Sequence, residues 1–158
     1  YMANLFPNAI FIGVRRQSEY NIQSLLLARE RQYGDMSQWY SFKIKGYRVL
    51  KNLEPLDSVA GQIAAINHSI EVGSADLSNP NRLVIQYEDF CQRPEHYFRE
   101  LINRLVAQGA FGGTEIPPYS GVDNFSNTNV WRLIKYSKAA ASQAYQKETH
   151  VQLNDQNI

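Results

Sequence analysis

The chain has 158 residues, 44% of them hydrophobic and 20% charged, so it can form one folded domain with a buried core. Its 16 basic and 15 acidic residues leave a net charge of +1, which excludes the strongly basic surface of a general nucleic-acid-binding protein. A single cysteine, Cys91, excludes an internal disulfide, and no apolar run approaches the ~20 residues of a membrane span.

The start of the chain bears on its origin and compartment. Residue 1 is a tyrosine rather than a methionine, and no charged-then-apolar signal peptide follows it. We therefore expect a cytoplasmic protein, and we expect the chain to be a fragment or a processed part of a longer one.

The N-terminal third predicts a buried strand followed by a helix. Residues 9–14 form a short apolar run rich in isoleucine, and a turn signal at Pro7 precedes them. Apolar residues then recur at helical spacing over 19–32. Ser18 is placed to cap this helix, and Gly34 is placed to end it.

The stretch 36–49 is rich in aromatic residues and lysines and has no clean period. Two interpretations stay open for it: a substrate-facing loop, or a loop whose aromatic rings pack on the domain.

The remainder predicts alternating helices and a second strand. Helical spacing marks 55–72, a buried strand is expected over 82–86, and Pro94 opens a helix that Gly109 ends. Residues 112–129 are turn-rich, and 137–147 are predicted to be helical. This order predicts an α/β domain with a parallel sheet, occupying residues 1–158 as a single domain.

Arg15 and Arg16 follow the first strand directly, and a helix begins soon after them. Ligands of parallel sheets gather at the carboxyl ends of strands, where a helix N-terminus and arginine N–H groups favour a phosphate. Ordinary surface charge is the alternative for this pair.

The segment FPNAIFIGVRRQSEYNIQSLL, at 6–26, resembles the 3′-phosphate-binding segment of the sulfotransferases that use 3′-phosphoadenosine-5′-phosphosulfate (PAPS). That family segment has Phe-Pro, an apolar strand, Arg-Asp/Asn-Pro, and a serine eight positions after the arginine. Arg16 and Ser24 match these two ligands, and the resemblance implies that both bind the nucleotide 3′-phosphate. Gln17 and Ser18 depart from the family's Asp/Asn and Pro. A solvent-facing helix serine is the alternative for Ser24.

A second segment, NRLVIQYEDFCQRPEHYFRELINRLVAQG at 81–109, resembles the family's later strand, Tyr-Glu-Asp, and Pro-Glu helix. The resemblance implies that Tyr87 lies beside the adenine, with packing at a strand end as the alternative. Glu88 and Asp89 are interpreted as structural, bonding loop N–H groups and capping the helix.

A third segment, SNTNVWRL at 126–133, is similar to a Gly-Arg-Trp-Arg stretch that some bacterial members place near the 3′-phosphate. The match covers Trp131 and Arg132 only. It implies that Arg132 contacts the cofactor, with a surface arginine as the alternative.

The resemblance implies a partial P-loop-type three-layer fold, with parallel strands flanked by helices and an incomplete N-terminal side. The implied reaction moves a sulfuryl group from PAPS to a hydroxyl or amine and leaves adenosine 3′,5′-bisphosphate. No phosphate loop occurs in residues 1–158, so this chain is expected to be inactive alone, with no catalytic residue assigned. His68, His96 and His150 have no metal-ligand spacing, and no metal is expected.

Two further interpretations stay open: a non-catalytic nucleotide-binding or interaction module built on the same scaffold, and a structural α/β protein without a ligand. The acceptor cannot be read from the residues. The partners expected are the nucleotide donor and an acceptor, with neither nucleic acid nor membrane. Self-association through the truncated sheet is also expected, because unpaired strand edges and exposed apolar faces tend to pair with another chain.

Overall fold

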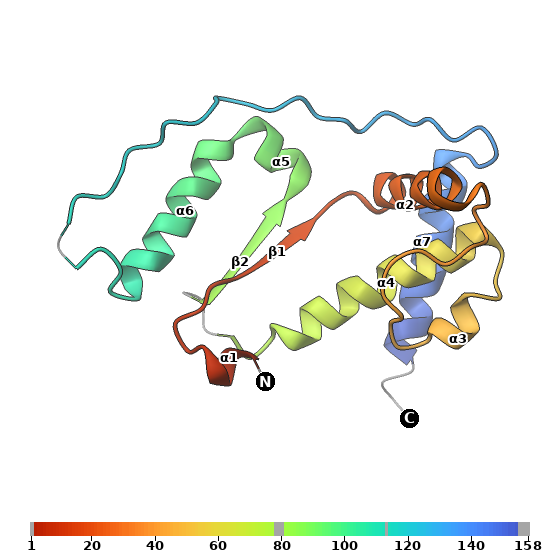
Figure 1. Cartoon of the computed structure of the whole chain (residues 1–158), viewed down its shortest axis with the longest axis horizontal. Coiled ribbons are helices and arrows are strands. Elements are labelled where there is room, and N and C mark those ends of the chain that lie inside the picture. The colour runs from red at the N-terminus through yellow and green to blue at the C-terminus, as the bar shows by residue number, and fades with distance from the viewer. Residues whose placement is uncertain (1, 78–80, 113, 155–158) are drawn as a thin grey trace. The chain divides into compact units, whose positions relative to one another are not determined.

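A computed structural model describes residues 2–77, 81–112 and 114–154, which form two compact units (Figure 1). Unit 1 comprises Tyr1–Arg16 and Val72–Thr128, and unit 2 comprises Gln17–Glu71 and Asn129–Ile158. No helix in the described part of the chain is both long and apolar enough to span a membrane.

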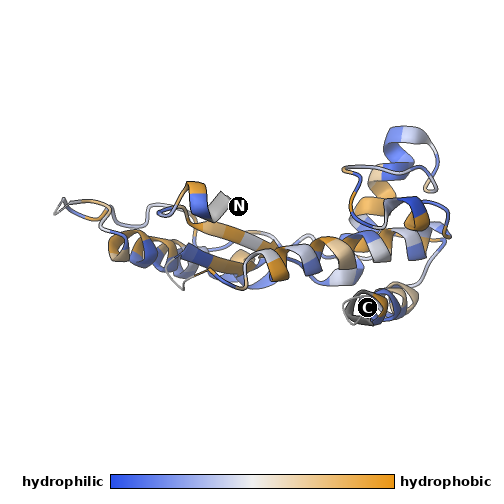
Figure 2. Ribbon diagram, turned by 90° about the horizontal axis from the view of Figure 1, so that it is seen from below, coloured by the Kyte–Doolittle hydropathy of each residue, from blue (hydrophilic) through white to orange (hydrophobic). Residues whose placement is uncertain are grey.

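Unit 1 is built on a two-stranded parallel sheet. β1 (Phe11–Arg15) pairs with β2 (Arg82–Gln86), and Phe11 lies opposite Arg82 while Arg15 lies opposite Gln86. Apolar residues dominate both strands (Figure 2). The predicted parallel pairing of these strands and the α/β class are therefore confirmed.

The described residues of unit 1 include the helices α1 (Met2–Leu5), α5 (Tyr87–Gln92) and α6 (Pro94–Ala107). α5 and α6 both contact β2. α6 begins with Pro94, whose fixed φ suits the first turn of a helix. The Arg104 Nε atom donates to the Arg82 carbonyl at 2.8 Å, which ties α6 to the start of β2.

One face of the sheet is unevenly covered. Leu83 of β2 is only 4% exposed, whereas Ile12 and Val14 of β1 are 47% and 59% exposed. A groove of about 490 Å³ lies over this face, between the two strands, α6 and the stretch 119–125. Among the described residues the sheet has two strands, so β1 has a strand partner on one edge only.

Unit 2 is helical. It contains α2 (Ser18–Tyr33), α3 (Tyr47–Leu50), most of α4 (Pro55–Gly73) and α7 (Lys138–Asn154). Its core joins α2, α4, α7 and the stretch before α7, through Ile22, Leu26, Val59, Ala60, Ile63, Leu133, Ala141 and Ala144.

The predicted start of α2 was wrong in detail. Ser18 is the first helical residue, Gln17 occupies the cap position, and no side-chain hydrogen bond caps the helix. The Ser18 hydroxyl instead lies 3.3 Å from the Glu19 carboxylate. Gly34 ends the helix with a φ of 68°, a conformation in which a glycine has no steric penalty.

A buried arginine fixes the aromatic loop at 36–46. The Arg29 guanidinium is fully buried and donates to the Met36 carbonyl, the Ser58 hydroxyl and the Gln62 side-chain carbonyl. Its Cζ lies 5.3 Å from the centre of the Trp39 ring. This part of the loop therefore packs on unit 2, although Phe42 projects into solvent.

Candidate functional site

The carboxyl end of the sheet brings together two residues that the sequence analysis assigned to the nucleotide. Arg16 follows β1, Tyr87 follows β2, and the strand register places them one position beyond the Arg15–Gln86 pair. The Arg16 Cζ lies 4.9 Å from the centre of the Tyr87 ring, within cation–π range. Both residues belong to unit 1 and are half-buried.

Tyr87 is also held at its polar end. Its hydroxyl lies 3.0 Å from the Thr128 hydroxyl, which also belongs to unit 1. The ring lines a mostly apolar cavity of about 410 Å³ together with Val14, Ile85, Phe90, Cys91, Phe125 and Ser126. The Phe90 and Phe125 rings stack with their centres 5.5 Å apart. The site thus combines a cation, an aromatic face and an apolar cavity.

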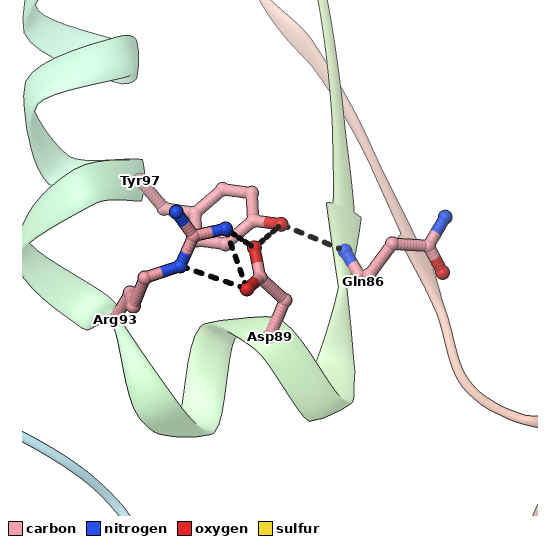
Figure 3. Close-up of polar contacts among 4 residues, drawn as sticks. All are labelled: Gln86, Asp89, Arg93 and Tyr97. Carbon is pink, nitrogen blue, oxygen red and sulfur yellow. Dashed lines mark hydrogen bonds and ion pairs between the residues drawn. The ribbon is translucent and has the colours of Figure 1, made fainter.

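An acidic side chain, Asp89, joins the end of β2 to α5 and α6 (Figure 3). Asp89 accepts hydrogen bonds from the Arg93 guanidinium, at 2.6–2.8 Å, and from the Tyr97 hydroxyl at 2.9 Å. The same Tyr97 hydroxyl lies 3.4 Å from the backbone nitrogen of Gln86, the last residue of β2. The network therefore joins β2, α5 and α6 around the residue that precedes Tyr87.

The network also shifts the pKa values of its members. The hydrogen bonds from Arg93 and Tyr97 hold the Asp89 pKa below its usual value, and the Asp89 carboxylate raises the Arg93 pKa. Burial, and then the bond to Asp89, raises the Tyr97 pKa. Asp89 thus has the structural role predicted for it, but through side-chain partners rather than as a helix cap.

Ser24 lies on the exposed side of α2 in unit 2. It lines a cavity of about 280 Å³ between α2 and α4, together with Asn21 and Asn67. Arg16 and Ser24 belong to different units, so their convergence on one anion stays a prediction.

Arg132 is attached to α2 through Gln23, a residue that the sequence analysis did not single out. The Gln23 side-chain carbonyl accepts the backbone N–H of Arg132 and, at 3.3 Å, that of Leu133. The Gln23 Nε2 donates to the Val130 carbonyl at 2.7 Å. The backbone of Arg132 is thus held at the residue that precedes Ser24, while the Arg132 side chain is exposed.

Thr128 and Gln23 are the two contacts that the sequence reasoning missed. Thr128 lies inside the third segment similar to sulfotransferases, so its position gave some signal. Gln23 gave none beyond being a polar residue next to Ile22, a residue of the core of unit 2. In the described part of the chain, no three His, Cys, Asp or Glu side chains gather in a way that could hold a metal ion.

Comparisons with known proteins add no assignment. The chain matches no protein-family model, no curated protein and no solved structure. A functional proposal therefore rests on the resemblance of the three segments and on the geometry of the two units.

Proposed function

We propose that this chain is the nucleotide-binding part of a PAPS-dependent sulfotransferase with a P-loop-type fold. The single observation that supports the proposal best is the contact between Arg16 and Tyr87. The resemblance of two separate segments implies that both residues bind the same cofactor. Arg16 and Tyr87 lie at the carboxyl ends of neighbouring parallel strands, where such sheets bind ligands.

Each proposed ligand would contact a different part of the nucleotide. Arg16 would donate hydrogen bonds to the 3′-phosphate, because the N–H groups at the edge of a guanidinium can bond a phosphate while its flat face contacts an aromatic ring. Tyr87 and the cavity beside it offer an aromatic, apolar surface to the adenine. The resemblance adds Ser24 and Arg132 of unit 2 as further phosphate ligands.

No residue of this chain is assigned to the transfer itself. Neither β1 nor β2 is followed by a glycine-rich phosphate loop, which the family uses to hold the reacting end of the donor. The proposal therefore limits these residues to anchoring the nucleotide. Remote anchoring of this kind aligns a donor for a reaction that other residues perform.

Titration calorimetry with two nucleotides tests the proposal. Adenosine 3′,5′-bisphosphate should bind about 10–100 times more tightly than adenosine 5′-monophosphate, since a charge-assisted arginine–phosphate pair contributes about 1.5–3 kcal/mol. Arg16→Ala should remove most of this preference. Arg15→Ala is the matched control and should remove less, because Arg15 lies on β1, opposite Gln86 of β2, whereas Arg16 lies beyond the end of the strand. Equal affinity for the two nucleotides would overturn the proposal.

A further inference from the structure

The stretch that carries Arg132 has no helix or strand to fix its backbone. Residues 129–137 lie between the turn-rich segment and α7, and none of them is in a helix or strand. Such a stretch holds a side chain in place only if other groups satisfy its backbone hydrogen bonds.

Gln23 supplies those hydrogen bonds from inside unit 2. Its side chain is only 4% exposed, and its amide bonds to the backbone on both sides of Trp131, at Val130, Arg132 and Leu133. One side-chain amide thus satisfies a carbonyl and two N–H groups, as a neighbouring strand would. A buried amide satisfied in this way is costly to remove, because its partners would be left unpaired.

The neighbours of Arg132 are fixed as well. Leu133 is buried in the core of unit 2, and the Trp131 Nε1 atom donates to the Tyr136 carbonyl at 3.1 Å. The Trp131 ring meets the Tyr20 ring of α2 edge-on, with centres 6.4 Å apart. Arg132 is thus an exposed cation between two anchored residues, and its own N–H is bonded to the residue before Ser24.

We infer that Gln23 is a positioning residue for the anion-binding role of Arg132. By holding the backbone at 130–133 on α2, Gln23 sets the direction from which the Arg132 guanidinium approaches a phosphate bound at Ser24. The inference rests on the proposed function and adds to it a residue that makes no contact with the ligand. The effect should appear in discrimination for the 3′-phosphate rather than in binding of the nucleoside.

A pair of matched variants tests this assignment. Gln23→Met keeps the length of the side chain and removes all three hydrogen bonds. Ser58→Ala is the control, since Ser58 is also buried in unit 2, at 1% exposure, and its hydroxyl accepts a hydrogen bond from the Arg29 guanidinium at 3.2 Å, away from the cavity that Ser24 lines. The control loosens the same unit without touching the residues around Arg132.

Calorimetry with adenosine 3′,5′-bisphosphate and adenosine 5′-monophosphate measures the ratio of the two affinities in each variant. Gln23→Met should lower the ratio of the two affinities about 3–10-fold, as far as Arg132→Ala does, and the double variant should lower it no further. Ser58→Ala should leave the ratio unchanged. Amide hydrogen exchange at Arg132 and Leu133 should accelerate in Gln23→Met but not in Ser58→Ala.

A second variant keeps the test decisive if Gln23→Met does not fold. Gln23→Glu retains oxygens that accept the two N–H groups and loses only the donation to Val130, so it should keep most of the ratio. If the wild type prefers the bisphosphate, two results would overturn the positioning role and leave the proposed function standing. One is that Gln23→Met retains the preference while its Arg132 amide exchanges faster; the other is that Gln23→Glu loses the preference while its Arg132 amide stays protected. Equal affinity of the wild type for the two nucleotides would instead overturn both.

Discussion

The guanidinium carbon of Arg16 lies 4.9 Å from the centre of the Tyr87 ring, one residue beyond the last pair of the parallel ladder. Because β1 and β2 run in the same direction, both strands end at the same edge of the sheet. The contact therefore follows from the register, which sets Arg15 opposite Gln86. It places a cation and an aromatic face beside a cavity of about 410 Å³.

Variants of Tyr87 separate the contribution of its ring from that of its hydroxyl. Tyr87→Phe keeps the ring beneath Arg16 and loses only the contact with Thr128, so binding of adenosine 3′,5′-bisphosphate should weaken by no more than about 3-fold. Tyr87→Leu removes the aromatic face, and binding should weaken about 10-fold, since cation–π and stacking contacts are each worth about 1 kcal/mol or more. Calorimetry measures both. Similar losses in the two variants would count against a role for the ring.

Asp89→Asn should change how stability depends on pH. The folded-state pKa of Asp89 is depressed, so its contribution is present above the unfolded pKa and is lost as the pH falls through the folded value. The variant should therefore melt at a lower temperature than the wild type at pH 7, and the difference should shrink on acidification from about pH 5 to pH 3. Thermal melts followed by circular dichroism measure it.

Glu95→Gln is the control for Asp89→Asn. Glu95 and Arg99, both on α6, form an exposed ion pair at 2.6 Å, and such pairs contribute little to the free energy of unfolding. A loss of stability in Glu95→Gln as large as that in Asp89→Asn would show that the corner around Asp89 has no special role.

The regular elements were predicted best where the local signal was strong. Strand 82–86 has the predicted bounds, and the helix predicted over 55–72 is α4, Pro55–Gly73. α5 was missed because its six residues are too few for a helical period to appear. Its position also depends on packing between Phe90 and the distant Phe125, which no local pattern reveals.

The candidate site was only partly predictable, for a related reason. Arg16 and Tyr87 carry side chains typical of nucleotide sites and follow strands, so residue type and position both marked them. Gln23 bonds to Val130, 107 positions away, and a polar residue on a buried helix face does not indicate its partner. The division into two units likewise rests on contacts between distant segments, which a single sequence does not show.

Glu148→Gln should have the opposite pH signature to Asp89→Asn. Burial raises the pKa of Glu148, so the stability linked to its protonation is present below the usual value of 4.5 and is lost as the pH rises through the folded value. Replacing this buried carboxylate with a neutral amide should stabilise the protein by roughly 1 kcal/mol at pH 7, and the gain should vanish near pH 4. Glu30→Gln, on the exposed side of α2, should change nothing. Denaturant unfolding at several pH values decides it, and a gain that persisted at pH 4 would rule out burial of the charge as the cause.

The exposed face of the sheet predicts self-association. Ile12 and Val14 are about half exposed on β1; Ile12 lines the apolar groove of about 490 Å³, and Val14 lines the mostly apolar cavity beside Tyr87. Apolar strand surfaces of this kind bury themselves against a partner, and a second copy of this chain is the partner present in a purified sample. Sedimentation velocity over a range of concentrations should therefore show a dimer or a larger species.

Val14→Lys should raise the dissociation constant at least ~10-fold, because an inward charge on an edge strand opposes pairing and the burial of one valine is worth about 1.5 kcal/mol. Val151→Lys is the control, since Val151 is similarly exposed, at 45%, but lies on α7 of unit 2. A monomer at all concentrations, or equal weakening by the two substitutions, would contradict association through β1.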